Sequence, residues 1–277
     1  MTRRRILSGV LLIALLAGGV FAAQTRRRGF GGFRRPLIRM ATAEDFDGNF
    51  LFCRIIFRNA PNGDGNGWGV DYPRADINLT FRLSELTTTT VSRDPEDDYR
   101  HVVVRLTDPL LFHCPFVMMT EPGGAFFDEA EAAQLRAYLL KGGFLWADDF
   151  WGEYAFRFWS EEMAKVLPPE RYPIADVPLD HALFHTLYDI RRIPQIPAID
   201  FWGGPGGPTS ERGRDSAVPH VRAIVDDEDG HIMVLMTHNT DFGDAFEREG
   251  DDHAYFLQFA PEGYAFGVNA IVYSMTH

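Results

Sequence analysis

The hydrophobic and polar residues divide the chain into a short N-terminal segment and a long region in which strand-like and helix-like stretches alternate. Apolar runs typical of buried strands lie at residues 50–57, 101–106, 116–120 and 144–147. Apolar positions at helical spacing, or a closing apolar stretch, predict helices at residues 74–87, 128–139, 153–166 and 263–275. This order predicts an α/β fold, a three-layer sandwich whose mostly parallel sheet is flanked by helices.

Local signals refine this prediction. Residues 74–87 fit both a strand and a helix, and Pro73 just before them favours the helix. Asp128 and Glu131 have the spacing of a helix capping box. Two apolar runs around the turn 226-DDEDG-230 predict an antiparallel hairpin at the edge of the sheet. The Pro- and Gly-rich residues 168–219 predict a long irregular excursion.

The N-terminal segment has the layout of an export signal. Residues 1–23 place three arginines before an apolar run that ends in Ala22 and Ala23, which predicts a signal peptide or an N-terminal anchor. Cleavage after Ala22 and retention as an anchor are both compatible with this pattern. Residues 24–47 read as a basic Gly/Arg-rich linker, either a solvated tether or a segment that lies on an anionic membrane. Residues 48–277 then form a single α/β domain, which we expect to be periplasmic or anchored to the membrane by the N-terminus.

Charge separates these two parts further. The 277 residues include 27 basic and 39 acidic side chains, and residues 1–40 hold nine arginines and no acid. The remainder therefore carries a net charge near −21. Such a body repels phosphate backbones, so we expect no nucleic-acid partner, and membrane contact only through the N-terminal segment. The expected partners are a small polar ligand, a glycan or a protein of the cell envelope.

The chain has two cysteines, Cys53 and Cys114, and both lie in apolar runs. This setting favours two buried, unpaired thiols over a single disulfide or a catalytic nucleophile.

Several strings in the sequence are distinctive. They are GWGVDYP at 67–73, RLSELT at 82–87, KGGFLWADDFWG at 141–152 and MTHNTD at 236–241. Together they resemble the bacterial domain-of-unknown-function family four-one-five-nine, over about residues 48–276. That family is similar in fold to class I glutamine amidotransferases, so the resemblance implies an amidotransferase-like, flavodoxin-like fold. It implies no activity.

Amidotransferase chemistry requires a cysteine on a sharp strand-to-helix turn. The corresponding turn in this chain is residues 146–152, where Asp148 and Asp149 stand at the centre. We therefore expect that the nucleophile is missing and that glutamine is not hydrolysed by this mechanism.

Polar residues that follow predicted strands are the candidates for a site, because ligands of open α/β sheets bind beyond the carboxyl ends of the strands. The candidate catalytic residues are Asp148, Asp149, His238 and Asp241. They could bind a divalent metal or act as acid and base, although no metal ligand is assigned. As neighbours in an extended chain, Asp148 and Asp149 point in opposite directions, so only one of them can serve. The alternative is that these side chains cap helices or turns.

The candidate ligand-binding residues include a Gly-flanked loop that carries two aromatic rings. They are Trp68, Asp71, Tyr72, Glu121, Trp151 and Asn239. Aromatic rings beside an acid suit stacking on a sugar or nucleobase, and they equally suit plugging the core. Arg212, Arg214 and Arg222 could clamp an anionic group, although ion pairs with surface carboxylates explain them more simply.

Two functions follow from these observations. The first is a non-catalytic, ligand- or partner-binding module of the cell envelope, for which the missing nucleophile argues. The second is a carboxylate- and histidine-based hydrolase, with or without a metal, in which Asp148 or Asp149 acts as ligand or base, His238 carries the proton and Asp241 supports them. The sequence assigns no cofactor.

Overall fold

The computed structural model describes residues 38–277. The predicted signal peptide or anchor at 1–23 and linker residues 24–37 lie outside the described part. Residues 38–47, which the sequence analysis places in the linker, belong to the folded unit. The Val103 N–H donates to the Arg39 carbonyl at 2.7 Å, and the Ala41 N–H donates to the Val103 carbonyl at 3.0 Å. The fold therefore begins about ten residues earlier than predicted.

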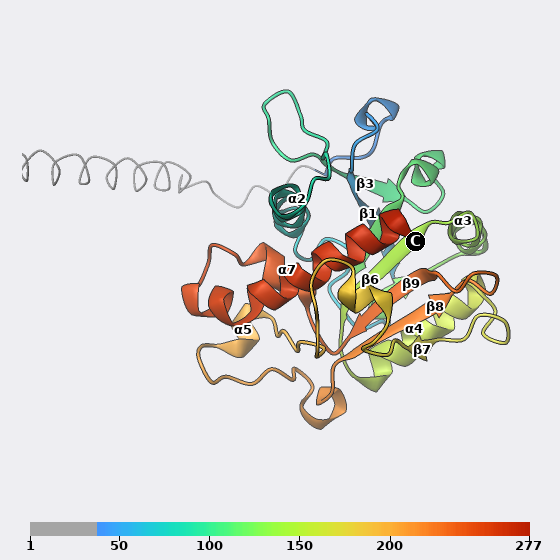
Figure 1. The fold of residues 1–277 in the computed structure, drawn as a ribbon. Helices are drawn as coiled ribbons and strands as arrows, with labels where there is room; N and C mark the ends of the chain where they lie inside the picture. Colours follow the sequence, from blue (N-terminus) through green and yellow to red (C-terminus); the bar gives the residue numbers. More distant parts are fainter. Residues whose placement is uncertain (1–37) are drawn as a thin grey trace, which may run out of the picture. The chain divides into compact units, whose positions relative to one another are not determined.

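A seven-stranded, mostly parallel sheet forms the centre of the molecule (Figure 1). Its strands, in spatial order, are β3 (His101–Arg105), β1 (Phe52–Ile56), β4 (Phe116–Thr120), β6 (Phe144–Phe150), β9 (Ile232–His238), β8 (His220–Val225) and β7 (Ala175–Asp176). The first five are parallel, whereas β8 and β7 run antiparallel to their neighbours. A second, two-stranded antiparallel sheet pairs β2 (Arg58–Asn59) with β5 (Ala125–Phe126).

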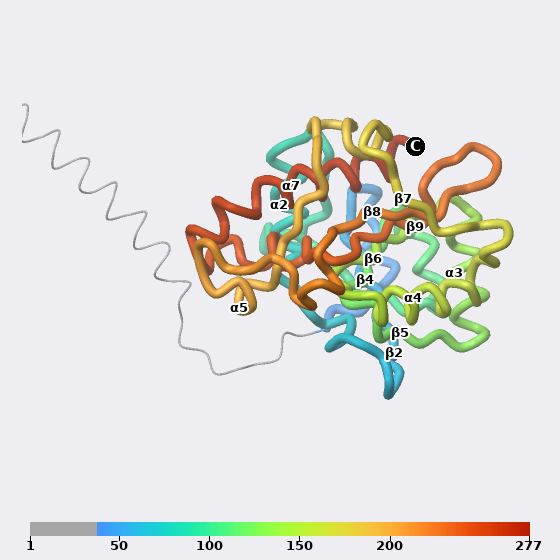
Figure 2. Tube along the Cα trace, turned by 90° about the horizontal axis from the view of Figure 1, so that it is seen from below, coloured from blue at the N-terminus to red at the C-terminus, as the bar shows by residue number. Residues whose placement is uncertain are grey.

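Helices cover both faces of the large sheet (Figure 2). One face packs against α2 (Arg74–Leu86), α6 (Phe242–Glu247) and α7 (His253–Thr276), and the other against α3 (Glu129–Leu139) and α4 (Gly152–Val166). Alternate residues of a strand serve the two cores: Phe116 and Met118 face the first set of helices, and Val117 and Met119 face the second. This double coverage explains why the strands read as continuous apolar runs.

Short helical segments lie in the connections. They are α5 (Ile199–Trp202) and the 3₁₀ turns η1 (Ala43–Asp45), η2 (Pro109–His113), η3 (Pro122–Gly124), η4 (Ala182–His185) and η5 (Gly213–Ser216).

The predicted α/β class and mostly parallel sheet are confirmed, and so are the helix after Pro73 and the capping box. The Asp128 carboxylate accepts from the Glu131 N–H and the Glu131 carboxylate accepts from the Asp128 N–H, each at 2.9 Å. The predicted start of the last helix is wrong, because α7 begins at His253 and runs through Pro261. Tyr255 and Phe259 in this first part of the helix are buried in the core. Their packing stabilises the helix across Pro261, although proline usually ends or prevents a helix.

Two other predictions need correction. The strand expected at 144–147 continues to Phe150, so Asp148 and Asp149 lie within β6 rather than after it. The predicted hairpin is present as β8 and β9, but the short strand β7 from the irregular excursion covers its outer side and becomes the edge.

The prediction of unpaired cysteines is wrong. Cys53 of β1 and Cys114, just before β4, form a disulfide whose Cα atoms are 6.1 Å apart. Both positions are buried and apolar, as expected, but the parallel pairing of β1 with β4 brings the two segments together. Residues separated by 61 positions gave no sequence signal of this contact.

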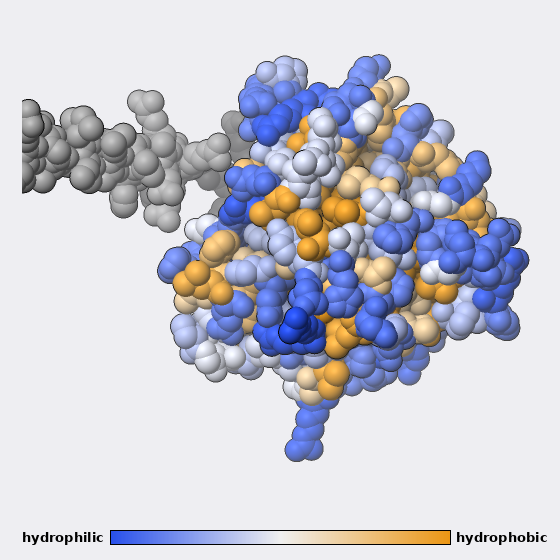
Figure 3. Space-filling model, viewed as in Figure 1, coloured by the Kyte–Doolittle hydropathy of each residue, from blue (hydrophilic) through white to orange (hydrophobic). Residues whose placement is uncertain are grey.

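One face of the surface can be described from the hydropathy of its residues. Figure 3 shows hydrophilic side chains over most of one face, with small apolar patches between them. Within residues 38–277, none of the helices is both long enough and apolar enough to span a bilayer.

Candidate functional site

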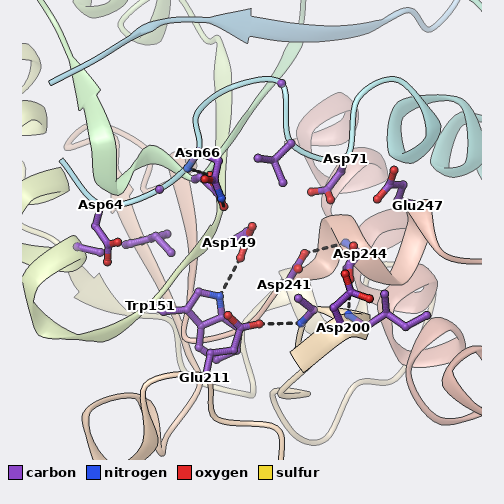
Figure 4. A pocket seen from close by; sticks show the side chains of 18 of the residues that line it. Asp64, Asn66, Asp71, Asp149, Trp151, Asp200, Glu211, Asp241, Asp244 and Glu247 are labelled. Carbon is purple, nitrogen blue, oxygen red and sulfur yellow. Dashed lines mark hydrogen bonds between the residues drawn. The ribbon is translucent and has the colours of Figure 1, made fainter. Parts of the chain in front are cut away.

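A cavity of about 570 Å³ lies at the carboxyl ends of the central strands, where ligands bind in open α/β sheets. Among the described residues its walls contain two arginines, Arg212 and Arg248, and many more carboxylates. The carboxylates are those of Asp64, Asp71, Glu121, Asp149, Asp200, Glu211, Asp241, Asp244 and Glu247. We call this space the acidic cavity (Figure 4).

Different elements deliver these carboxylates. Asp71 lies in the loop before α2, Asp149 lies near the end of β6, and Asp241 precedes the first residue of α6. The pairing of β6 with β9 shifts register between Asp148 and Phe150, so Asp149 sits at a bulge. Bulges re-aim side chains beside functional sites, and this one turns Asp149 into the cavity.

Three of these acids have a left-handed backbone. The φ angles are 62° at Asp71, 50° at Glu121 and 60° at Asp149. Asp adopts this conformation more readily than most side chains, but it still costs free energy. The surrounding fold holds three such residues around one cavity, a concentration of strain that is typical of functional sites.

The carboxylates of Asp71, Asp149 and Asp241 form a central trio. One oxygen from each lies within 4.8 Å of the others, and the residues are only 6%, 6% and 3% exposed. Asp149 Oδ1 accepts from Trp151 Nε1 at 2.8 Å, and Asp241 Oδ1 accepts from the Asp244 N–H at 2.7 Å. Within residues 38–277, Asp71 Oδ2 is buried without a hydrogen-bond partner. Figure 4 shows these side chains facing a common space.

Burial dominates the electrostatics of the central trio. It raises the pKa of Asp71 well above its usual value, and the charge of Asp244 adds to this effect while Arg54 opposes it. Burial and the charge of Glu121 raise the pKa of Asp149. Burial and the charge of Asp149 raise the pKa of Asp241. Three desolvated, mutually repelling carboxylates are therefore held together, and within residues 38–277 none of them forms an ion pair or a hydrogen bond with a basic side chain.

Such a trio suits a hard divalent cation. Carboxylate oxygens are the preferred ligands of Ca²⁺, Mg²⁺ and Mn²⁺, and a cation replaces repulsion among the acids by attraction to a shared charge. The residues present supply three of the six to eight oxygens that Ca²⁺ takes. The remaining positions would face the cavity, where water or a ligand can complete the coordination.

An outer trio shares Asp71 with the central one. Oxygens of Asp71, Asp244 and Glu247 also lie within 4.8 Å of one another. Here a basic side chain is present: Arg248 Nε donates to Asp244 Oδ1 at 3.0 Å, and Arg248 Nη2 lies 2.8 Å from Glu247 Oε2.

Loops from distant parts of the chain close the rim of the acidic cavity. Glu121 accepts from the backbone N–H groups of Asn66 and Gly67, the latter at 2.9 Å. Arg212, one of the arginines considered for an anion clamp, pairs with Asp64 at 3.0 Å. The simpler expectation, an ion pair with a carboxylate, describes this arginine.

Beneath the cavity, Arg54 of β1 holds the loop that carries Asp71. It is fully buried, its Nη1 donates to the Val70 carbonyl at 3.1 Å, and its Nε donates to Asp76 Oδ1 at 3.0 Å. Arg54 therefore connects the central sheet with the segment just before Asp71. This role of Arg54 was not predicted from the sequence, although Arg54 is the single charged residue within the apolar run 50–57.

Six of the ten residues proposed from the sequence line the acidic cavity. They are Asp71, Tyr72, Glu121, Asp149, Trp151 and Asp241. Trp68, Asp148, His238 and Asn239 lie outside its lining. Asn239 instead holds the start of α4, because its Oδ1 accepts from the Gly152 N–H at 2.8 Å. Asp241 combines both expected roles, since it caps α6 and lines the cavity.

Asp148 does not line the acidic cavity. Its carboxylate accepts from the Thr237 hydroxyl and, at 2.9 Å, from the Gly243 N–H. Burial raises the pKa of Asp148 to about 7, although these two hydrogen bonds favour the charged form. Asp148 thus supports the segment that leads into α6 rather than facing the cavity.

His238 is enclosed by other groups. Its Nε2 lies 3.0 Å from the Gly152 carbonyl and its Nδ1 lies 3.1 Å from Arg222 Nη1. Because a guanidinium can only donate, Nδ1 accepts and Nε2 carries the proton. Burial lowers the pKa of His238 to about 4, which keeps this ring neutral. The geometry leaves neither nitrogen free to move a proton in the cavity.

Several cavity residues were not predicted. Asp200 and Glu211 come from the irregular excursion, which offers no periodic pattern to read. Asp244 and Glu247 did carry a signal: with Asp241 they place an acid at every third residue, which is one face of a helix. The helix itself has only six residues, too few for periodicity to reveal it.

Comparisons with known proteins bear on the family of this chain. A search of curated proteins found no match. The protein family described as "Domain of unknown function (DUF4159)" matches residues 57–275, which include all four distinctive sequence strings. The match covers most of the chain and nearly all of the large sheet and its helices. The chain therefore belongs to the DUF4159 family.

Proposed function

We propose that this protein is a divalent-cation-binding domain, in which a cation held by the central trio organises the acidic cavity for a small polar ligand. The observation that carries the proposal is that Asp71 Oδ2 is buried without a hydrogen-bond partner within residues 38–277, while the Asp71 side chain lies beside the buried carboxylates of Asp149 and Asp241. An unpaired buried carboxylate oxygen is costly, and a cation offsets that cost.

Charge restricts the class of ligand. Nine carboxylates line the described cavity against two arginines, so one divalent cation leaves its walls negative. A neutral, hydroxyl-rich ligand such as a glycan fits these walls better than a phosphate, since carboxylates accept hydrogen bonds from hydroxyl groups and repel anions.

The cellular setting is part of the same proposal. We infer that the protein is exported and works in the periplasm or at the cell envelope, with an envelope protein as a further possible partner. The signal-like residues 1–23 support this inference, and the Cys53–Cys114 disulfide does so independently, because disulfides persist in oxidising compartments. We also propose that the fold is amidotransferase-like, because a short connection leads from β6, which contains Asp149, directly into α4.

The experiment is a titration of chelator-treated protein with Ca²⁺, Mg²⁺ and Mn²⁺. Calorimetry measures the heat of binding, and thermal unfolding measures the change in Tm. At a concentration 100 times the Kd, the stabilisation is about 2.7 kcal/mol, which should raise the Tm by roughly 5–10 °C. Asp149→Asn and Asp241→Asn should lose most of this shift. Asn tolerates the left-handed backbone at 149 and remains a good helix cap at 241, so both variants should fold.

Asp200→Asn is the matched control, because it removes a carboxylate of the same cavity outside the central trio. It should keep the shift to within about 2 °C, less than 1 kcal/mol of binding free energy. Absence of binding heat and of any Tm change for all three cations in the parent protein would overturn the proposal.

A second candidate function is a cation-assisted hydrolase. The observation that favours it is the left-handed backbone of Asp149 at the bulge near the end of β6, just before the connection to α4, because nucleophiles of other α/β enzymes lie on a strained turn between a strand and a helix. The same variants separate the two candidates. A hydrolase loses cation-dependent cleavage of p-nitrophenyl esters in Asp149→Asn, whereas a binding module shows no such cleavage in the parent protein.

A further inference from the structure

The acidic cavity contains two overlapping groups of three carboxylates, each close enough together to hold a cation, and the two groups have different neighbours. The central trio and the outer trio share Asp71, and each brings three carboxylate oxygens within 4.8 Å of one another. Two cations that share a bridging carboxylate form the familiar arrangement of two-metal sites, with ions about 3.5–4 Å apart. The geometry of the carboxylates alone would therefore allow two ions.

Arg248 breaks the equivalence of the two positions. Its Nε and Nη2 bind Asp244 and Glu247 at 3.0 and 2.8 Å, and its Nη1 lies 3.5 Å from Asp251 Oδ2. The outer carboxylates thus already share a positive charge. Within the described residues, 38–277, the central trio has no such partner, since Asp149 and Asp241 accept from Trp151 and the Asp244 N–H, which are neutral donors.

The arginine also leaves Asp71 unsatisfied. Asp71 belongs to both trios and is only 6% exposed, and its Oδ2 has no hydrogen-bond partner within residues 38–277. A glycine at 243 makes room for this oxygen, because a Cβ there would overlap with it. The free oxygen therefore points to one missing positive charge beside the central trio, rather than to two.

We propose that Arg248 takes the place of a second metal ion, so that the acidic cavity holds one divalent cation on the central trio and a guanidinium on the outer trio. This inference rests on the proposed function, because it presupposes that the central trio binds a cation. A guanidinium keeps its charge at any physiological pH. The carboxylates of Asp244, Glu247 and Asp251 raise the pKa of Arg248 further, although burial lowers it. The site thereby gains a permanent positive charge that needs no ion.

The experiment counts bound Mn²⁺ in the full-length chain by equilibrium titration and records its electron paramagnetic resonance spectrum. The parent protein should bind one Mn²⁺ per chain with the six-line spectrum of an isolated ion. Arg248→Met removes the guanidinium and keeps the apolar stem, and it should bind two Mn²⁺ whose spectra broaden through mutual coupling. The second ion should bind at least tenfold more tightly in Arg248→Met than any second ion in the parent.

Two variants control for trivial effects of the substitution. Arg248→Lys keeps the positive charge and should remain at one Mn²⁺. Arg212→Met removes the other arginine of the same cavity, which pairs with Asp64 outside both trios, and should also remain at one. If Arg248→Met does not fold, as judged by circular dichroism, Arg248→Gln is titrated in its place.

The outcomes distinguish this inference from the proposed function. Two coupled ions in the parent protein, or a single ion in a folded Arg248→Met or Arg248→Gln, would overturn the role of Arg248 and leave the cation site intact. No bound Mn²⁺ in the parent protein would overturn both. One ion in the parent and two coupled ions only in the variants without a charge at 248 would support the inference.

Discussion

Two groups of buried ionisable side chains differ in whether the chain supplies them with partners: the Arg54–Asp76 pair and the central trio. Arg54 and Asp76 are both fully buried, and the guanidinium donates to both carboxylate oxygens, to two backbone carbonyls and to the Thr120 hydroxyl. The central trio is almost as buried, yet it gathers three acids without a base, and Asp71 Oδ2 has no partner in the described chain.

The difference shows what each group is for. Where a charge supports the fold, the structure surrounds it with every partner it can use, as at Arg54. Where acids are buried without such partners, as in the central trio, we propose that a cation from outside the chain supplies the missing positive charge. Buried charge alone therefore does not mark a site, whereas buried charge that the fold leaves unpaired does.

The largest expected effect breaks the satisfied group. Arg54→Met leaves Asp76 as an uncompensated buried charge, and it should lower the free energy of unfolding by about 3–5 kcal/mol, measured by urea denaturation. The double variant Arg54→Met/Asp76→Leu removes both charges and should recover at least half of this loss. A cost below about 1 kcal/mol for the single variant would show that the pair does not support the fold.

The stability of the protein should depend on pH through the buried acids at and behind the acidic cavity. Burial raises the pKa of Asp148, which supports the cavity from behind, from 3.8 to about 7. The folded protein therefore holds a proton that the unfolded chain releases. The protonated Asp148 therefore adds to the free energy of unfolding; this contribution is fully present below about pH 4 and is lost as the pH rises through 7. At 1.4 kcal/mol per tenfold change in proton affinity, its full size is about 4 kcal/mol.

The variant Asp148→Asn should remove that pH dependence. The Asn oxygen can accept from the Gly243 N–H and its amide can donate to Thr237, so the neutral side chain fits the same place. In chelator-treated protein, denaturation at pH 5 and pH 8 should give more similar stabilities for the variant than for the parent. An unchanged pH profile would assign the dependence to other acids.

The smallest expected effect reverses sign with the cation. Asp71→Asn removes one buried, repelled charge and should stabilise the chelator-treated protein at pH 8 by about 1–2 kcal/mol, close to one tenfold change in proton affinity. With saturating cation the parent should become the more stable of the two. Thermal unfolding with and without cation measures both, and a variant that is less stable under both conditions would contradict the distinction between the two groups.

The sequence predicted the large elements well, because strands covered on both faces and amphipathic helices leave strong patterns. It also found Asp71 in its Gly-flanked loop and Asp241 after β9. It could not separate Asp149 from Asp148 and His238, because the bulge in β6 changes which side chains face the cavity. A register shift of one residue reverses the direction of every following side chain, and apolar periodicity does not reveal it.

Contacts between distant segments account for the rest. The Cys53–Cys114 disulfide depends on the order of the strands, and the Arg212–Asp64 pair depends on the path of the irregular excursion. The Arg54–Asp76 pair depends on how α2 packs on β1. A single sequence contains the partners but not the pairing.

The acidic cavity also has a consequence for how the protein matures. Asp71 comes from the first third of the chain, Asp149 from its middle and Asp241 from its last forty residues, so the central trio exists only after nearly the whole chain has been made and folded. An intermediate that lacks the C-terminal part, or a chain still crossing a membrane, cannot assemble it. A bound cation would thus stabilise only the completed molecule, and it would act as a late step that locks in correct folding where the ion is plentiful.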